Sequence, residues 1–122
     1  MSAIIVDDNK EVCEAFAEYL KMEGIRVLGV AHDGKSGAKT FRKVRPDIVF
    51  LDVAMPEYDG YYALRSIRDC DQDAFVVVLT ACNYEDVEER TRDVRPDGII
   101  IKPCNTRKLR QIIEARKAAL PA

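Results

Sequence analysis

Three aspartates, a threonine and a lysine are the residues of this sequence with the clearest chemical potential. They come directly after its short apolar runs: Asp7, Asp8, Asp52, Thr80 and Lys102. If three carboxylates meet at one point, each pair at 4 Å repels by roughly 4 kcal/mol at an effective dielectric constant near 20, a large share of a small domain's stability. A hard divalent cation would relieve this repulsion. Mg²⁺ suits such oxygen ligands, and no soft ligand lies beside them to favour zinc.

Together these residue types could accept a phosphoryl group. With a cation bound, one carboxylate can act as the nucleophile toward phosphorus. The Thr80 hydroxyl and the Lys102 ammonium can then donate hydrogen bonds to the phosphoryl oxygens as charge builds. The residues therefore predict a site that forms an aspartyl phosphate, provided that the fold brings them together.

Short apolar runs alternate with segments of helical period, which is typical of a parallel sheet covered by helices on both faces. The predicted strands are Ala3–Val6, Ile25–Val30, Asp47–Leu51, Ala74–Leu79 and Gly98–Ile101. The third and fourth runs are continuously apolar and are expected at the centre of the sheet, whereas Arg26 and Gly29 favour an edge for the second. Ligands of such sheets bind beyond the carboxyl ends of the strands, where all five candidate residues fall.

Five segments are predicted to be helical. They are Val12–Leu20, Gly34–Lys43, Asp59–Asp69, Tyr84–Asp93 and Leu109–Arg116. The first and last carry an apolar stripe at spacings of three and four residues, and Gly24 is expected to end the first. The Tyr84–Asp93 segment has Val87 as nearly its only apolar side chain, so we expect that helix to be loosely held.

Each candidate residue also has a purely structural interpretation. Asp8 could cap a helix together with Glu11, and Asp52 opens a loop containing Pro56 and Asp-Gly that could serve only as a turn. Thr80 could begin a helix, and Lys102 could be an ordinary surface lysine. Their conjunction at one end of the sheet favours the functional interpretation.

The composition predicts one soluble domain, residues 1–122, which can build a core without disulfides or a structural metal. The net charge of −2 argues against a dedicated nucleic-acid binder, and the single histidine, His32, excludes multi-histidine metal sites. The cysteines form no C-x-x-C pair and are expected to be free buried thiols: Cys13, Cys70, Cys82 and Cys104. No run is long enough for a signal peptide or a membrane span, which favours a cytoplasmic location and no membrane partner.

Four ordered motifs resemble the receiver domain of two-component response regulators, and the resemblance covers the chain from Ala3 to the last helix. They are Asp7-Asp8, Asp52-x-x-Met-Pro-x-x-Asp-Gly, Thr80-Ala81 and Lys102-Pro103. The resemblance implies a flavodoxin-like α/β fold, with five parallel strands in the order 2-1-3-4-5 and five helices on both faces. This strand order is that of flavodoxin and of a chemotaxis receiver.

The resemblance also implies a role for each residue. Asp52 would accept a phosphoryl group from a phosphohistidine on a kinase or phosphotransfer protein. Mg²⁺ would be held by Asp7, Asp8, Asp52 and the backbone carbonyl of Ala54. The phosphate would be bound by Thr80, Ala81, Lys102 and Ala54, and the Lys102-Pro103 bond would be cis. The phosphorylated state would change partner binding, with no enzymatic activity beyond self-phosphorylation and slow autodephosphorylation.

The sequence departs from the family at several positions. Many receivers have an aromatic residue three positions before the lysine, where this chain has Ile99, so the usual coupling of the threonine to an aromatic switch is in doubt. Ala54 and Cys82 stand at the positions that tune dephosphorylation, and neither holds an attacking water strongly, which predicts a long-lived phosphoryl group. Cys104 follows Lys-Pro, where the family often has a larger hydrophobe.

Two other functions stay open. A haloacid-dehalogenase-type Mg²⁺ phosphatase would combine similar groups, but it would need Asp-x-Asp where this chain reads Asp52-Val53-Ala54. A receiver-like interaction module without phosphorylation is the second. Since the sequence ends after the fifth predicted helix, we expect a stand-alone regulator or a piece of a longer one, with partners or a dimer on the side of the fourth and fifth helices.

Overall fold

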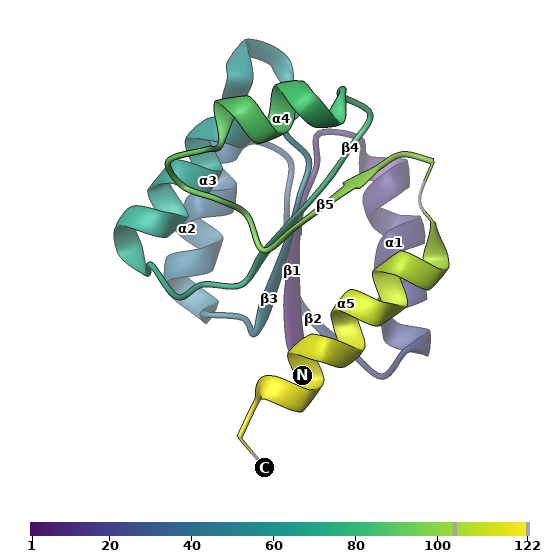
Figure 1. Ribbon diagram of the computed structural model, residues 1–122. Coiled ribbons are helices and arrows are strands. Elements are labelled where there is room, and N and C mark those ends of the chain that lie inside the picture. The colour runs from purple at the N-terminus through teal and green to yellow at the C-terminus, as the bar shows by residue number, and fades with distance from the viewer. Residues whose placement is uncertain (104, 122) are drawn as a thin grey trace.

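Five parallel strands form one sheet in the order β2-β1-β3-β4-β5 in the computed structural model (Figure 1). The structure describes residues 1–103 and 105–121, and only the backbone of residue 58. The strands are β1 Ser2–Val6, β2 Arg26–Ala31, β3 Ile48–Leu51, β4 Val76–Thr80 and β5 Gly98–Ile101. The predicted parallel sheet, its order and the edge position of the second strand are confirmed.

Helices cover both faces of the sheet, with α1 and α5 on one face and α2, α3 and α4 on the other (Figure 1). Their bounds are α1 Lys10–Met22, α2 Gly34–Val44, α3 Asp59–Cys70, α4 Tyr84–Arg90 and α5 Thr106–Ala119, with a short 3₁₀ helix η1 at Pro56–Tyr58. No helix of the described residues has both the length and the apolar character needed to cross a bilayer.

Two hydrophobic clusters, one on each face, explain why the central strands are apolar throughout. Along β3, Val49 and Leu51 pack toward α2 and α3, while Ile48 and Phe50 pack toward α1 and α5. All four side chains are almost completely buried. Side chains alternate between the faces of a strand, so a sheet covered on both sides needs apolar residues at every position.

Side-chain caps set where most helices begin. Asn9, Asn83 and Asn105 accept hydrogen bonds from the first backbone N–H groups of α1, α4 and α5, and Asp33 does the same for α2. The interpretation of Asp8 as the cap of the first helix is therefore wrong. Because Asn9 supplies the cap, the Asp8 side chain is left for another role.

Several element boundaries also differ from the sequence prediction. β2 starts at Arg26 and runs on to Ala31, and β4 starts at Val76 and includes Thr80 as its last residue. The prediction that Thr80 could open a helix is wrong, because its carbonyl still accepts a ladder hydrogen bond from Lys102 N–H at 2.7 Å. α4 ends at Arg90 rather than residue 93, where the buried Thr91 hydroxyl donates back to the Val87 carbonyl at 2.7 Å.

Candidate functional site

Three carboxylates gather at the carboxyl ends of β1 and β3. Asp7, Asp8 and Asp52 each offer an oxygen within 4.8 Å of the other two. Asp7 and Asp52 are buried, with 5% and 7% of their surfaces exposed, whereas Asp8 is exposed. The backbone explains the approach, because β1 and β3 are adjacent and Asp52 N–H continues their ladder to the Val6 carbonyl at 2.9 Å.

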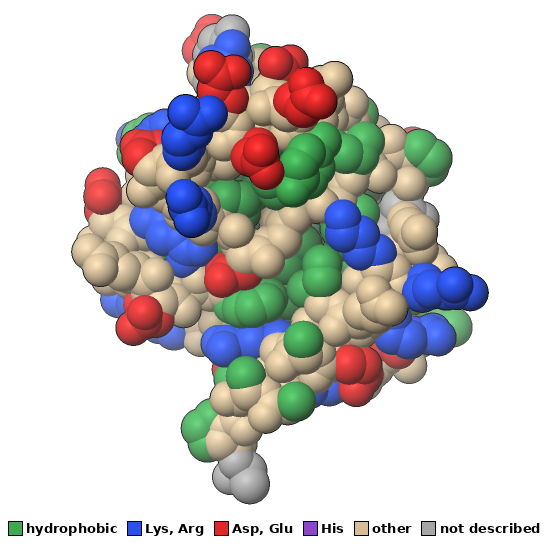
Figure 2. Space-filling view, viewed as in Figure 1, with side chains coloured by type: hydrophobic (Ala, Val, Ile, Leu, Met, Phe, Trp, Pro, Cys, Tyr) green, Lys and Arg blue, Asp and Glu red, His purple; other side chains and the backbone are tan. Residues whose placement is uncertain are grey.

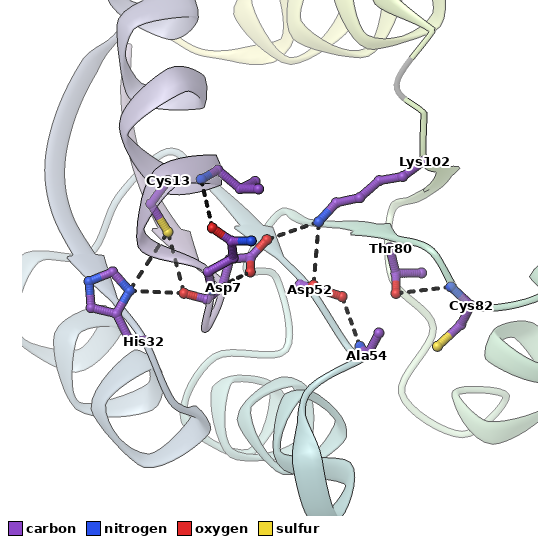
Figure 3. Close-up of polar contacts among 10 residues, drawn as sticks. Asp7, Cys13, His32, Asp52, Ala54, Thr80, Cys82 and Lys102 are labelled. Atoms are coloured by element: carbon purple, nitrogen blue, oxygen red, sulfur yellow. Dashed lines mark hydrogen bonds and ion pairs between the residues drawn. The ribbon is translucent and has the colours of Figure 1, made fainter.

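Lys102 forms ion pairs with both buried carboxylates. Its ammonium lies 2.9 Å from Asp7 Oδ2 and 3.4 Å from Asp52 Oδ2 (Figure 3). Burial alone lowers the pKa of Lys102, but its hydrogen bond to Asp7 and the charge of Asp52 outweigh that effect and raise the pKa above its ordinary value. The lysine is thus a charged part of the site, and its interpretation as an ordinary surface residue is wrong.

Thr80 lies on the next strand, on the side of Asp52 that faces β5 (Figure 3). It is fully buried, and its Oγ1 accepts a hydrogen bond from the backbone N–H of Cys82 at 3.3 Å. Because the Cys82 N–H is the donor in this hydrogen bond, the hydroxyl proton of Thr80 stays available for donation to another acceptor. Ala81 follows at the exposed surface.

The loop after β3 holds the Asp52 side chain in place. Ala54 N–H donates to Asp52 Oδ1 at 2.8 Å, and the buried side chains of Val53 and Met55 anchor the loop on either side. Gly60, inside the first turn of α3, packs against the backbone of Asp52 and Val53 so closely that a Cβ atom would collide with both. The Asp-Gly pair therefore forms the start of α3, which packs against the backbone of Asp52. The interpretation that this pair serves only as a turn is wrong.

A thiol and an imidazole surround the backbone carbonyl of Asp7 (Figure 3). His32 Nδ1 lies 2.9 Å from this oxygen, and Cys13 Sγ lies 3.3 Å from it. Burial, followed by the negative charge of Asp7, raises the pKa of Cys13 to about 11 and keeps the thiol protonated at neutral pH. Sequence reasoning missed this cluster, because neither residue belongs to a motif and 19 positions separate them.

The structure thus brings the predicted Asp7, Asp8, Asp52 and Lys102 together, with Thr80 on the neighbouring strand. Ile99 lies on β5, where it is half-buried and packs against the cluster under α2, α3 and α4. The predicted cis bond between Lys102 and Pro103 is present. Of the predicted free thiols, Cys13 is buried, Cys70 and Cys82 are half-buried, and Cys104 lies outside the described residues.

The fold and this site define a class of protein. The family model of the response regulator receiver domain matches residues 3–114. The chain belongs to this family, and it is a receiver domain of two-component signalling, a class of domains that accept phosphoryl groups.

The chain is similar to curated regulators of two kinds. It is 31% identical over 108 residues to the chemotaxis protein CheY of Treponema pallidum (strain Nichols), covering 87% of this chain and 75% of that protein. It is 34% identical over 111 residues to the transcriptional regulatory protein PdtaR of Mycobacterium tuberculosis (strain H37Rv). That alignment covers 91% of this chain but 54% of PdtaR, so the chain spans about half the length of this relative.

A solved structure supports the same assignment. A chain in the crystal structure of the CheX-CheY-BeF3-Mg²⁺ complex from Borrelia burgdorferi superposes with a TM-score of 0.85 at 26% sequence identity. The match covers 94% of this chain and 87% of that chain.

Proposed function

We propose that Asp52 is the phosphoacceptor of this receiver domain and that Asp7, Asp8 and Asp52 hold the Mg²⁺ ion that the reaction needs. The observation that carries the proposal is the gathering of these three carboxylates within 4.8 Å, beside an ammonium that neutralises only part of their charge. Three carboxylates and one ammonium together carry a net charge of −2. A divalent cation matches that remaining charge.

The donor set also fits magnesium by its chemistry. Hard carboxylate oxygens are the protein ligands that Mg²⁺ prefers, and the exposed Asp8 leaves one side open to water and phosphate oxygens. The backbone carbonyl of Ala54 is our candidate for a further ligand. When bound, the ion would neutralise charge on the transferring phosphoryl group and on the carboxylate that attacks it. The Borrelia complex supports this choice, because that CheY complex contains both Mg²⁺ and BeF3.

The chain's own groups then have distinct roles in phosphoryl transfer. An oxygen of Asp52 attacks phosphorus and forms the O–P bond, while the N–P bond to the donor histidine breaks and its electron pair stays on the imidazole. Lys102, 3.4 Å from Asp52, can donate to the phosphoryl oxygens, and so can the Thr80 hydroxyl. The backbone N–H groups of Ala81 and Ala54 are candidates for the remaining oxygens.

Phosphorylation would redistribute charge where these groups meet. The new phosphoryl group adds about −1.5 to −2 charges. Lys102, now held mainly by Asp7 at 2.9 Å, would be drawn toward it, and Thr80 would follow. Ile99 on β5 is the candidate for transmitting that shift, although it lacks the aromatic ring common at this position. The local change would then alter the surface that partners bind.

The surface formed by α4, β5 and α5 is our candidate for the partner or dimer interface. Figure 2 shows hydrophobic side chains in the hollow between α4 and α5, with lysine and arginine side chains on both sides. The donor would be a histidine kinase or phosphotransfer protein in the cytoplasm. We further propose that residues 1–122 act as one receiver unit, without direct contact with nucleic acid or membrane, and without enzymatic turnover beyond its own phosphorylation and dephosphorylation.

The test is phosphorylation of the purified chain by acetyl phosphate in the presence of Mg²⁺, followed by intact mass. We expect a gain of one phosphoryl group that EDTA prevents and that Asp52→Asn removes. Asp73→Asn, at an exposed aspartate in the loop before β4, is the matched control and should still be phosphorylated. No gain in the wild type, or a gain that survives Asp52→Asn, would overturn the proposal.

A chromogenic phosphate ester separates this function from the phosphatase alternative. A phosphatase would release the chromophore over many turnovers, whereas a receiver would not turn it over. Sustained release that depends on Asp52 would favour the phosphatase.

A further inference from the structure

The backbone carbonyl of Asp7 accepts side-chain hydrogen bonds from two other elements. His32, in the loop between β2 and α2, places Nδ1 at 2.9 Å from this oxygen, and Cys13 of α1 places Sγ at 3.3 Å. The two donor atoms lie 3.8 Å from each other (Figure 3). Because a carbonyl oxygen can only accept, His32 must carry its proton on Nδ1 at this contact. The end of β1, helix α1 and the loop after β2 therefore meet at one oxygen atom.

This carbonyl lies directly behind the exposed carboxylate of the site. The C=O of Asp7 and the N–H of Asp8 share one rigid peptide plane, so the orientation of the first determines where Asp8 begins. The rest of Asp7 is also held, since its N–H donates to the Ala31 carbonyl at 3.0 Å and its carboxylate accepts from Asn9 N–H and from Lys102, each at 2.9 Å. Every polar group of Asp7 is thus tied to a different neighbour.

Asp8 itself is not held in this way. Among residues 1–103 and 105–121, no hydrogen bond or ion pair reaches its side chain, which is exposed. Its placement within 4.8 Å of the Asp7 and Asp52 ligand atoms therefore depends on the backbone that carries it. The anchored carbonyl of Asp7 is the part of that backbone nearest to Asp8.

We propose that His32, assisted by Cys13, is a positioning residue that orients the Asp7–Asp8 peptide so that both carboxylates can hold the cation. This inference rests on the proposed function, in which Asp7 and Asp8 bind Mg²⁺. Neither His32 nor Cys13 takes part in the phosphoryl transfer itself. Groups that orient the ligands of a metal commonly change its affinity by about 10- to 100-fold when they are removed.

The experiment compares two substitutions of the same residue in the full chain. In His32→Asn the side-chain amide nitrogen can take the place of Nδ1 as a donor to the carbonyl, whereas His32→Leu has similar bulk and no donor. Mg²⁺ binding is followed by the NMR amide signals of the protein. We expect His32→Leu to bind Mg²⁺ about tenfold more weakly and His32→Asn to stay within about threefold of the wild type.

Three further measurements distinguish positioning from a general structural role. Phosphorylation of His32→Leu by acetyl phosphate should return to near the wild-type rate at saturating Mg²⁺, because only the affinity for the ion has changed. Cys13→Ala should weaken Mg²⁺ binding in the same direction, and Cys70→Ala, a thiol on α3, should not. The imidazole of the wild type should show the Nδ1–H tautomer in its nitrogen NMR signals, a readout that needs no variant.

The possible outcomes distinguish failure of the positioning role of His32 from failure of the proposed function. If the wild type binds no Mg²⁺, the proposed function fails. If the wild type binds Mg²⁺ and His32→Leu binds it equally well, the positioning role fails while the proposed function stands. An Nε2–H tautomer in the wild type, or equal losses of affinity in His32→Asn and His32→Leu with equally lowered melting temperatures, would also overturn the positioning role.

Discussion

The Lys102 ammonium donates to the Asp7 carboxylate at 2.9 Å, across 95 residues of sequence, and so joins an interior strand to an edge strand of the sheet. The same ammonium is 3.4 Å from Asp52. Two of the three carboxylates that would bind Mg²⁺ are therefore also the acceptors of the lysine. The lysine and the cation should compete for the same negative charge.

Replacing Lys102 tests this competition. Lys102→Met leaves two buried carboxylates unpaired, which we expect to lower the free energy of unfolding by about 3 kcal/mol in EDTA. Mg²⁺ should then restore more stability to the variant than it adds to the wild type, because the ion alone now neutralises the site. Urea unfolding with and without Mg²⁺ measures both quantities.

Lys39→Met, at an exposed position of α2, is the control for loss of a lysine and should respond to Mg²⁺ as the wild type does. Equal stabilisation of Lys102→Met and the wild type by Mg²⁺ would show that ammonium and ion do not compete.

The close approach of Gly60 to the phosphoacceptor strand gives a second prediction. Alanine favours a helix over glycine by about 1 kcal/mol, but here its Cβ would collide with the backbone of Asp52 and Val53. We expect Gly60→Ala to lower the free energy of unfolding by about 2 kcal/mol and to slow phosphorylation by acetyl phosphate, because Asp52 is displaced. Urea unfolding and intact mass measure the two effects.

Gly24→Ala is the matched comparison. Gly24 has a φ of 79° and no atom near its added Cβ, so alanine should cost about 1–2 kcal/mol without altering the phosphorylation rate. A Gly60→Ala variant as stable and as reactive as the wild type would contradict the packing argument.

Much of the fold could be predicted because its signals are local. A continuous apolar run in the sequence directly indicates a strand that is covered by helices on both faces. The carboxyl ends of parallel strands necessarily share one edge of the sheet. For this reason the sequence alone predicts that Asp7, Asp52 and Lys102 lie close together. The end of β4 was misplaced because Thr80, a polar residue, still continues the backbone ladder after the apolar run stops.

What sequence reasoning missed depends on contacts between different elements of the fold. The role of Gly60 comes from how α3 lies against Asp52, and an Asp-Gly pair in sequence more readily indicates a turn. His32 and Cys13 meet only because β2 and α1 flank the end of β1. Neither residue type carries a periodic or motif signal that would predict such a meeting.

The side chains beside the phosphoacceptor lead to a third prediction, on the lifetime of the phosphoryl group. Hydrolysis needs a water held and oriented for attack, and the methyl group of Ala54 and the half-buried thiol of Cys82 are poor acceptors for it. We expect the phosphorylated chain to outlast the scale of seconds in Mg²⁺ and Ala54→Gln to shorten its lifetime. Intact mass against time after removal of the donor measures the decay.

Ala118→Gln, on the exposed surface of α5, controls for the added amide and should leave the decay unchanged. A wild-type half-life of seconds, or an unaltered lifetime in Ala54→Gln, would contradict this account of hydrolysis.

The buried thiol of Cys13 predicts how stability depends on pH. Burial, then the charge of Asp7, raises its pKa from 9.0 to about 11, with Lys102 opposing the shift. The folded state thus holds this proton more tightly than the unfolded state does. The resulting stabilisation is fully present below pH 9 and is lost as the pH rises toward about 11.

Cys13→Ala isolates this contribution, because other groups titrate in the same range in both proteins. We expect the variant to be less stable than the wild type at pH 7.5 because packing is lost, and the difference in free energy of unfolding should shrink steadily above pH 9. Urea unfolding of both proteins at several pH values measures it. A constant difference for Cys13→Ala would mean that the thiol titrates alike in the folded and unfolded chains, and the surrounding carboxylates and burial would then exert no net hold on its proton.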